Sequence, residues 1–319
     1  MTLRKKWLMI LSGIFLLVII SACSNQGNNL NEQSEPIEPK QFAEVLLAGE
    51  FKRIYAQMSD EFQKQVSLKE IERLGKDFNK GVDEFKLISE MKIDDTIQRL
   101  AWVDEEEEKG MMVVFNEDHT IERLQLIPLA KHGDTDEVFT ETIFDFPFED
   151  EWFVFWGGTN VLVNYHYELE QQRYAFDFLK IKDGKSYEGD ASKNESYFAF
   201  GEKYLAPAAG IVIETENIIP DNDPVGDVDT ENPAGNYVII DHGNEEYSFL
   251  AHFKHGSIEV EEGDKVEQGD VLGLVGNSGN SSEPHIHFHV ADAPDLEASK
   301  SIRINFDTGD SIIQGDFVK

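Results

Sequence analysis

The sequence predicts two unlike regions, a small α+β region followed by a larger, mostly antiparallel all-β region. Apolar residues recur at helical intervals over 41–78, and short strand-like runs follow over 84–128. Beyond residue 146, β-branched and aromatic runs alternate with Gly, Asn, Asp and Pro. We therefore place an α+β domain at 40–129, a linker at 130–145 and a β-rich domain at 146–319.

The first residues have the pattern of an export signal. Three basic residues precede the apolar run 7–20, which is short for a membrane span. The run ends in Ile20-Ser21-Ala22-Cys23, which resembles a bacterial lipobox. We expect a lipoprotein signal peptide at 1–22, cleavage before Cys23, and a lipid on its thiol that anchors the chain to the outer face of the cell membrane. An uncleaved N-terminal anchor helix is the alternative.

Composition limits the partners of the chain. The segment 23–39 is rich in Asn, Gln, Ser, Glu and Pro, so we expect a flexible tether. Asp and Glu number 62 against 28 Lys and Arg, a net charge of −34. So acidic a surface repels nucleic acid and anionic lipid, and we expect neither as a partner. Because Cys23 is the only cysteine, the core or a metal must stabilise the fold without disulfides.

The α+β region begins with helices and ends with strands. Ser67-Leu68-Lys69-Glu70 has the pattern of a capping box that opens one of the helices. Four strands are expected at 85–88, 98–103, 111–115 and 120–127. In element order the region resembles the nuclear-transport-factor-like modules that precede the enzyme part in several exported bacterial proteins. No catalytic constellation is visible there, and its protein partner is unknown from the sequence.

The β-rich region contains eight candidate strands. They are residues 151–156, 161–166, 174–180, 210–214, 237–242, 247–253, 271–275 and 285–291. Between two of them, the acidic and turn-rich segment 220–234 is expected to be an exposed loop over one rim of the domain.

The most informative segment is Pro284-His285-Ile286-His287-Phe288-His289. Side chains alternate along a strand, so His285 and His287 are expected to face the same side. Two imidazoles on one face suit a metal ion or a proton-transfer site. The alternative is a pair of solvated histidines on an edge strand, and so short a motif does not decide between the two.

Further motifs surround this strand in a characteristic order. They are LAPAAGIV at 205–212, GNYVIIDHG at 235–243, YSFLAH at 247–252, the glycine-punctuated hairpin GDKVEQGDVLG at 263–273, and GNSG at 276–279. Their order and content resemble the lysostaphin and LytM type of zinc peptidases, which are peptidoglycan endopeptidases with an antiparallel β core. The resemblance covers about residues 152–291 and rests on several motifs that agree in order.

The resemblance implies a lipid-anchored zinc metalloendopeptidase that hydrolyses peptide bonds of peptidoglycan, and a role for each site residue. His166, Asp177 and His287 would hold Zn²⁺ and leave one position open for water. His285 would act as general base toward the metal-activated water, and His252 would stabilise the oxyanion. Zinc is expected over magnesium or calcium because imidazoles predominate among the ligands.

The chain departs from the family in the spacing of the first two ligands. The family has H-x-x-x-D, whereas about ten residues separate His166 from Asp177. We interpret this insertion as a polar hairpin turn between two adjacent strands. Asn164 is expected to orient a ligand or to contact substrate. His289, a residue type that the family seldom uses there, is expected to support the ligands from behind or to be solvated.

Two other readings compete with the enzyme. A catalytically silent wall-binding or regulatory relative would keep the fold, but such relatives usually lose ligands, and this chain keeps a complete candidate set. A carrier domain is suggested by the turns of 263–273, which resemble those of biotinyl and lipoyl domains, but no lysine stands at the tip of a fitting hairpin. The sequence does not specify which peptidoglycan bond is cut.

Overall fold

The computed structural model describes residues 35–93, 96–308 and 311–319, and Pro36–Lys319 form one unit. The expected signal peptide, the lipidated Cys23 and most of the tether lie outside the described residues. Among the helices of the described part, none combines the length and the apolar character that crossing a membrane requires.

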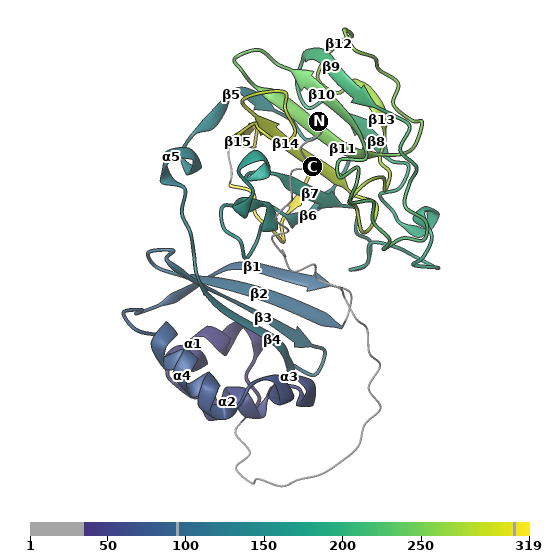
Figure 1. The fold of residues 1–319 in the computed structure, drawn as a ribbon. Helices are drawn as coiled ribbons and strands as arrows, with labels where there is room; N and C mark the ends of the chain where they lie inside the picture. Colours follow the sequence, from purple (N-terminus) through teal and green to yellow (C-terminus); the bar gives the residue numbers. More distant parts are fainter. Residues whose placement is uncertain (1–34, 94–95, 309–310) are drawn as a thin grey trace, which may run out of the picture. The chain divides into compact units, whose positions relative to one another are not determined.

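The N-terminal region opens with short helices that pack on a four-stranded sheet (Figure 1). The helices are η1 (Pro39–Gln41), α1 (Phe42–Leu47), α2 (Phe51–Ala56), α3 (Asp60–Gln65) and α4 (Leu68–Phe78). The predicted capping box is confirmed at the start of α4. Ser67 Oγ accepts a hydrogen bond from the backbone of Glu70, and the Glu70 carboxylate accepts one from the backbone of Ser67.

The sheet runs antiparallel in the order β1-β2-β3-β4, as predicted. Its strands are β1 (Phe85–Ile93), β2 (Ile97–Asp104), β3 (Lys109–Asn116) and β4 (Ile121–Pro128). One face packs on the helices, where Phe42 contacts Trp102 and Phe115. The α+β prediction is confirmed, whereas the likeness to nuclear-transport-factor-like modules stays a prediction.

The other face of this sheet is also covered. Ala101 of β2 and Met112 of β3 pack against Leu162 and Val163, which belong to the β-rich region. Successive side chains of a strand point to opposite faces of the sheet. Alternate residues of β2 and β3 therefore pack on the helices on one face and on residues of the β-rich region on the other. The N-terminal sheet is therefore joined through its second face to the segment that leads into the predicted metal ligand His166.

The β-rich region is built on a ten-stranded sheet whose main path is β12-β9-β10-β11-β14-β7-β6-β16, with β15 and β5 attached beside β14. Its strands are β5 (Phe139–Phe144), β6 (Trp152–Trp156), β7 (Phe176–Leu179), β9 (Gly210–Glu216), β10 (Asn236–Asp241), β11 (Tyr247–Phe253), β12 (Lys265–Val266), β14 (Ile286–Ala291), β15 (Ser301–Phe306) and β16 (Phe317–Val318). A second sheet pairs β8 (Lys203–Leu205) with β13 (Val271–Leu274). Every pairing is antiparallel except β5 with β15, so the predicted class is confirmed.

Two local predictions are wrong. Residues 161–166 form no strand, because η2 (Tyr165–Glu168) and η3 (Glu170–Gln172) replace the expected strand and hairpin turn before Asp177. Residues 263–273 form no hairpin, because β12 pairs with β9 and β13 pairs with β8. The expected linker 130–145 contains α5 (Gly133–Asp136) and strand β5. A further 3-10 turn, η4 (Asn194–Ser196), lies in the long connection before β8.

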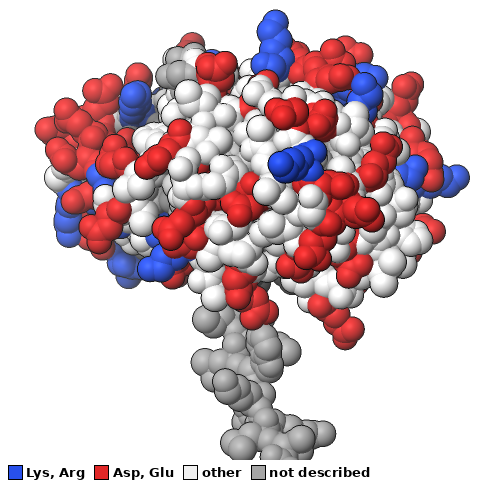
Figure 2. All heavy atoms as spheres, turned by 90° about the horizontal axis from the view of Figure 1, so that it is seen from above, with Lys and Arg blue, Asp and Glu red and all other residues white. Residues whose placement is uncertain are grey.

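The acidic composition is visible on the surface. Figure 2 shows groups of Asp and Glu spread across the displayed face between uncharged areas, and fewer Lys and Arg than Asp and Glu. The predicted acidic loop 220–234 contains no helix and only an isolated bridge between Asp221 and Ser278. Its backbone is tied to the turn that precedes the histidine strand, because Asp229 N donates to Gly279 O (2.9 Å) and Asn280 N donates to Pro233 O (3.0 Å).

Candidate active site

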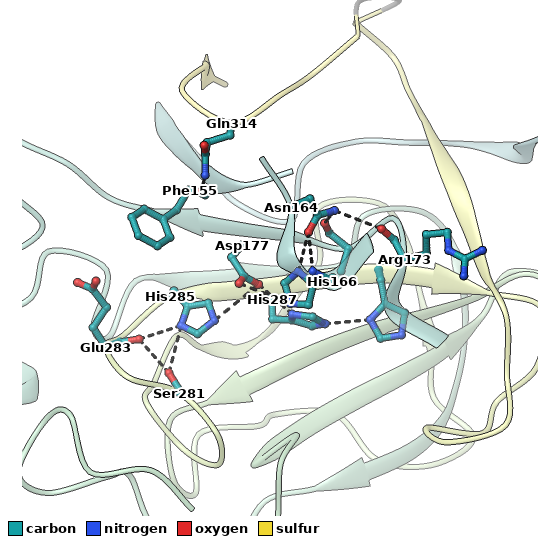
Figure 3. A network of polar contacts seen from close by, with 12 residues as sticks. Phe155, Asn164, His166, Arg173, Asp177, Ser281, Glu283, His285, His287 and Gln314 are labelled. Atoms are coloured by element: carbon teal, nitrogen blue, oxygen red, sulfur yellow. Dashed lines mark hydrogen bonds and ion pairs between the residues drawn. The ribbon is translucent and has the colours of Figure 1, made fainter. Parts of the chain in front are cut away.

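Three neighbouring strands bring the predicted site residues together, and Figure 3 shows four of them, His166, Asp177, His285 and His287. In the register of the sheet, Ala251 of β11 lies opposite His287 of β14, and His287 lies opposite Asp177 of β7. His252 follows Ala251, and His285 immediately precedes β14. Directly opposed residues on paired strands lie within about 5.5 Å, so the register makes Asp177 and His287 neighbours. The ring of His252 lies beside them, with its centroid 4.7 Å from that of His285 and 5.8 Å from that of His287.

The fifth residue arrives from outside the sheet. His166 lies in η2 and points at Asp177, with His166 Nε2 3.6 Å from Asp177 Oδ2. His287 Nδ1 lies 2.9 Å from Asp177 Oδ1. One ligand atom from each of these three buried residues lies within 4.8 Å of the others. The structure thus unites the predicted metal ligands despite the wrong prediction for the insertion between them.

Asn164 determines how His166 presents its ring. Asn164 Oδ1 accepts a hydrogen bond from the backbone N–H of His166 (3.1 Å) and lies 2.9 Å from His166 Nδ1. Because an amide oxygen can only accept, Nδ1 carries the proton and Nε2 carries the lone pair. That Nε2 atom is fully buried and has no hydrogen-bond partner among the described residues. A buried lone pair that faces a carboxylate oxygen at 3.6 Å fits a cation shared by the two atoms.

Electrostatics favour the same protonation states. Burial lowers the pKa of His166 to about 3, so its ring is neutral at physiological pH. Burial opposes the ionisation of Asp177, but the surrounding rings of His166, His285 and His287, the last through a hydrogen bond, outweigh that effect and lower its pKa. Two neutral imidazoles and one carboxylate are the donor set that zinc takes in proteins, and three such donors leave a fourth position open.

His287 is held from both sides. Its Nε2 lies 3.0 Å from Nδ1 of His289, a buried ring that stacks on Phe249 (centroids 4.6 Å apart, planes at 4°). If Nδ1 of His287 gives its lone pair to a metal, Nε2 must carry the proton and donate it to His289. His289 is buried and lies behind His287, as expected for a residue that supports a ligand, so the solvated alternative is wrong.

His285 has a settled tautomer. Its Nδ1 lies 2.8 Å from the carbonyl oxygen of Glu283 and 3.1 Å from Ser281 Oγ. The carbonyl can only accept, so Nδ1 carries the proton, and the lone pair of Nε2 lies 3.7 Å from Asp177 Oδ1. The ring can therefore accept a proton at the centre of the site.

His252 has the same arrangement on the opposite strand. Its Nδ1 donates to Ser278 O at 2.8 Å, and its ring centroid lies 4.7 Å from that of His285. The residue has a φ of 65°, which is uncommon for a residue with a Cβ and occurs where function maintains a strained backbone. Burial lowers the pKa of His252 well below its ordinary value, so Nε2 offers a lone pair and no proton.

Of the two roles expected for Asn164, orienting a ligand or contacting substrate, the structure supports the first. Asn164 is fully buried, and its Nδ2 faces the carbonyl oxygens of Gly158, Arg173 and Ala175 at 3.1–3.2 Å, so it orients His166 and has no atom left for substrate.

Sequence reasoning missed the residues that hold the histidines. Tyr204 Oη donates to the carbonyl of His287 at 2.5 Å across 83 residues of sequence, and no local pattern signals such a contact. Ser278 and Glu283 act through backbone carbonyls, which carry no residue signature. Ser281 alone had a signal, because a hydroxyl stands four residues before the first histidine of the motif.

Comparisons with known proteins agree with this geometry. Residues 197–297, about a third of the chain, match Peptidase family M23. The match contains His252, His285 and His287 but begins after His166 and Asp177, which the structure alone adds to the site.

Individual relatives match over short stretches. Peptidoglycan DD-endopeptidase ShyA of Vibrio cholerae serotype O1 is 43% identical over 58 residues, 18% of this chain and 13% of that protein. An uncharacterized metalloprotease of Buchnera aphidicola is 44% identical over 57 residues, 18% of this chain and 15% of that protein. The chain thus spans less than a fifth of the length of these curated relatives. The crystal structure of a putative peptidase M23 from Pseudomonas aeruginosa aligns over 61% of this chain and 71% of its own, at 18% identity and a TM-score of 0.31.

Proposed function

We propose that this chain, which carries a Peptidase family M23 domain at residues 197–297, is a zinc metalloendopeptidase that hydrolyses peptide bonds of peptidoglycan. The observation that carries the proposal is the convergence of His166, Asp177 and His287 around one point beside the Nε2 lone pair of His285. The substrate class is supported by the DD-endopeptidase name of the Vibrio cholerae relative. The complete donor set argues against a catalytically silent relative.

The three donors fit zinc in kind and in number. His166 would bind through Nε2 and His287 through Nδ1, because the other ring nitrogen of each faces a fixed partner. Asp177 would contribute the negative charge that the site needs beside two neutral rings. When bound, zinc would polarise the scissile carbonyl and make a water molecule more acidic.

His285 is the proposed general base. Its Nδ1–H is held by the carbonyl of Glu283, so Nε2 faces the centre as a proton acceptor. It would take a proton from the attacking water and return it to the amine that leaves when the peptide bond breaks. The carbonyl of Glu283 would stabilise the imidazolium that exists between these two transfers.

His252 would orient the attacking water together with His285. As a neutral ring it accepts a hydrogen bond at Nε2, and it would stabilise an oxyanion only after taking up a proton. We therefore propose that His252 and His285 each accept a hydrogen bond from the attacking water, and that only His285 removes a proton from it. His252 could donate a hydrogen bond to the oxyanion only after its Nε2 has taken up a proton.

The location of the reaction follows from the N-terminus. We propose that the chain is exported and tethered by a lipid on Cys23 to the outer face of the membrane, which would place the enzyme beside its substrate. Expression of the full gene with a radiolabelled fatty acid tests this. Label on the wild type and none on Cys23→Ala is the expected result, and label that survives the substitution would contradict it.

Digestion of purified peptidoglycan tests the enzyme. The zinc-loaded wild type is expected to release fragments with new amino termini, identified by mass spectrometry, whereas His285→Ala releases none above background. His255→Ala is the matched control, because that histidine is exposed and lies three residues from His252. Intact peptidoglycan after digestion with wild type that contains one zinc per chain would contradict the proposal.

A further inference from the structure

Arg99 of β2 is a buried cation without an ionic partner. It is 9% exposed, and no carboxylate of the described residues pairs with it. Its guanidinium donates instead to the carbonyl of Leu162 and to Gln314 Oε1 (3.0 Å), and it lies over the ring of Trp156 at 4.9 Å. Burial, and to a smaller extent Arg123, lowers its pKa to about 10. A buried charge whose contacts are all with neutral groups lowers the stability of the fold, which indicates that Arg99 has a role beyond packing.

The contact with Leu162 connects Arg99 to the metal ligands through the backbone. Leu162 belongs to a tight turn in which Asn160 Oδ1 accepts from Leu162 N (3.0 Å) and Asn160 O accepts from Asn164 N (3.0 Å). Asn164, two residues further on, fixes both the backbone and the ring of His166. Arg99 thus binds the turn at Leu162, and this turn positions Asn164, which in turn orients the proposed zinc ligand His166.

A second line of contacts runs through aromatic rings. The ring of Trp156, beneath the Arg99 guanidinium, meets Tyr165 edge-on with centroids 5.4 Å apart and planes at 83°. The ring of Tyr165 in turn lies against His166, with centroids 3.9 Å apart and planes at 33°. Two independent sets of contacts therefore lead from Arg99 to His166, one through hydrogen bonds and one through aromatic ring contacts.

The surrounding contacts hold the guanidinium in place. Gln314, which is 1% exposed, donates through Nε2 to Phe155 O (2.7 Å), and its carbonyl accepts from Ser89 Oγ of β1 (2.9 Å). Beside it, Leu162 packs on Ala101 of the N-terminal sheet. The N-terminal sheet thus contributes a cation and an apolar surface to the turn that carries Asn164, and a donor to Gln314 beside it.

We propose that Arg99 is a positioning residue for the metal ligand His166, and that the N-terminal sheet is in this way a structural part of the peptidase metal site. The inference rests on the proposed zinc function and adds a role for the N-terminal region. Arg99 contacts Leu162, Gln314 and Trp156, and it would act on His166 through Leu162, Asn164 and Tyr165.

Zinc affinity of the full-length chain tests the proposal, measured by competition with a chromophoric chelator. Arg99→Met removes the charge and both donated hydrogen bonds while keeping an apolar chain, and we expect zinc to bind about tenfold more weakly or worse. Leu100→Val is the matched control, because Leu100 is the next residue on β2, is buried on the opposite face, and destabilises the same sheet without touching the turn. Its zinc affinity is expected to stay within twofold of wild type.

A conservative variant keeps the test decisive if Arg99→Met does not fold. Arg99→Lys retains the charge but not the planar fork, so it is expected to bind zinc with an affinity between those of wild type and Arg99→Met. Amide hydrogen exchange over residues 160–167 should be faster in Arg99→Lys than in wild type, with unchanged exchange in β14. Unchanged zinc affinity and exchange in the Arg99 variants, or an equal loss in Leu100→Val, would overturn the inference. Wild type that binds no zinc would instead overturn the proposed function.

Discussion

Replacing His289 with Phe isolates one hydrogen bond behind the proposed metal site. The substitution keeps a flat ring against Phe249, whose ring lies 4.6 Å away and nearly parallel, so the packing is largely conserved. It removes the acceptor 3.0 Å from His287 Nε2. In the zinc-bound protein the proton on that nitrogen would then be buried without a partner.

The size of the effect follows from comparing the two states of the site. A buried donor left unsatisfied costs about 1–3 kcal/mol. In the metal-free protein His287 can instead donate from Nδ1 to Asp177 at 2.9 Å, so Nε2 loses an incoming hydrogen bond there, which offsets part of the difference. We expect a net loss near the lower end, about 1.4 kcal/mol, or a tenfold weaker zinc affinity.

The assay is zinc competition at pH 7.5 with the full-length chain. His289→Gln is the control, because its amide oxygen can replace the lost acceptor, and it should bind zinc within about threefold of wild type. If His289→Phe binds zinc as tightly as wild type while His287→Ala has lost its affinity, the reasoning about the tautomer of His287 is refuted.

Removing His285 should separate catalysis from metal binding. His285→Ala is expected to lower kcat on peptidoglycan fragments by about 10²–10⁴-fold while the zinc content stays at one per chain. Loss of the zinc would contradict a purely catalytic role for His285. Zinc should raise the thermal midpoint of wild type, since saturation at 100 Kd stabilises the folded state by about 2.7 kcal/mol, and no shift is expected for His287→Ala in calorimetry. The metal-free protein should lose stability between pH 7.5 and 5. Burial lowers the pKa of His252 and His289, so the unfolded chain takes up protons below about pH 6.5 that the folded chain does not, and unfolding is favoured. The lowered pKa of Asp177 acts in the same direction at still lower pH, and a urea midpoint that rises on acidification would contradict both.

The strand positions of the site could be predicted because they follow from a period of two. His285 and His287 share a face in any strand, and the motif order implied their partners Asp177 and His252. The register that puts His287 opposite both Ala251 and Asp177 required the sheet itself, since strand order is a long-range property.

The arrival of His166 could not be derived from its local pattern. The polar insertion after it suggested a hairpin turn, but Asn164 caps a 3-10 turn by accepting from His166 N, and that hydrogen bond outweighs strand propensity. The role of Arg99 was invisible for a different reason. Its partners Leu162 and Gln314 lie 63 and 215 residues away in sequence, and a buried arginine has no local signature.

Anomalous diffraction at the zinc edge, from crystals of the full-length protein grown with zinc, tests the central claim most directly. The account predicts one strong peak about 2.0–2.2 Å from His166 Nε2, His287 Nδ1 and an oxygen of Asp177, with a fourth position open toward His285. A peak that leaves any of these three residues unbound, or no peak at this point in zinc-containing crystals, would contradict it.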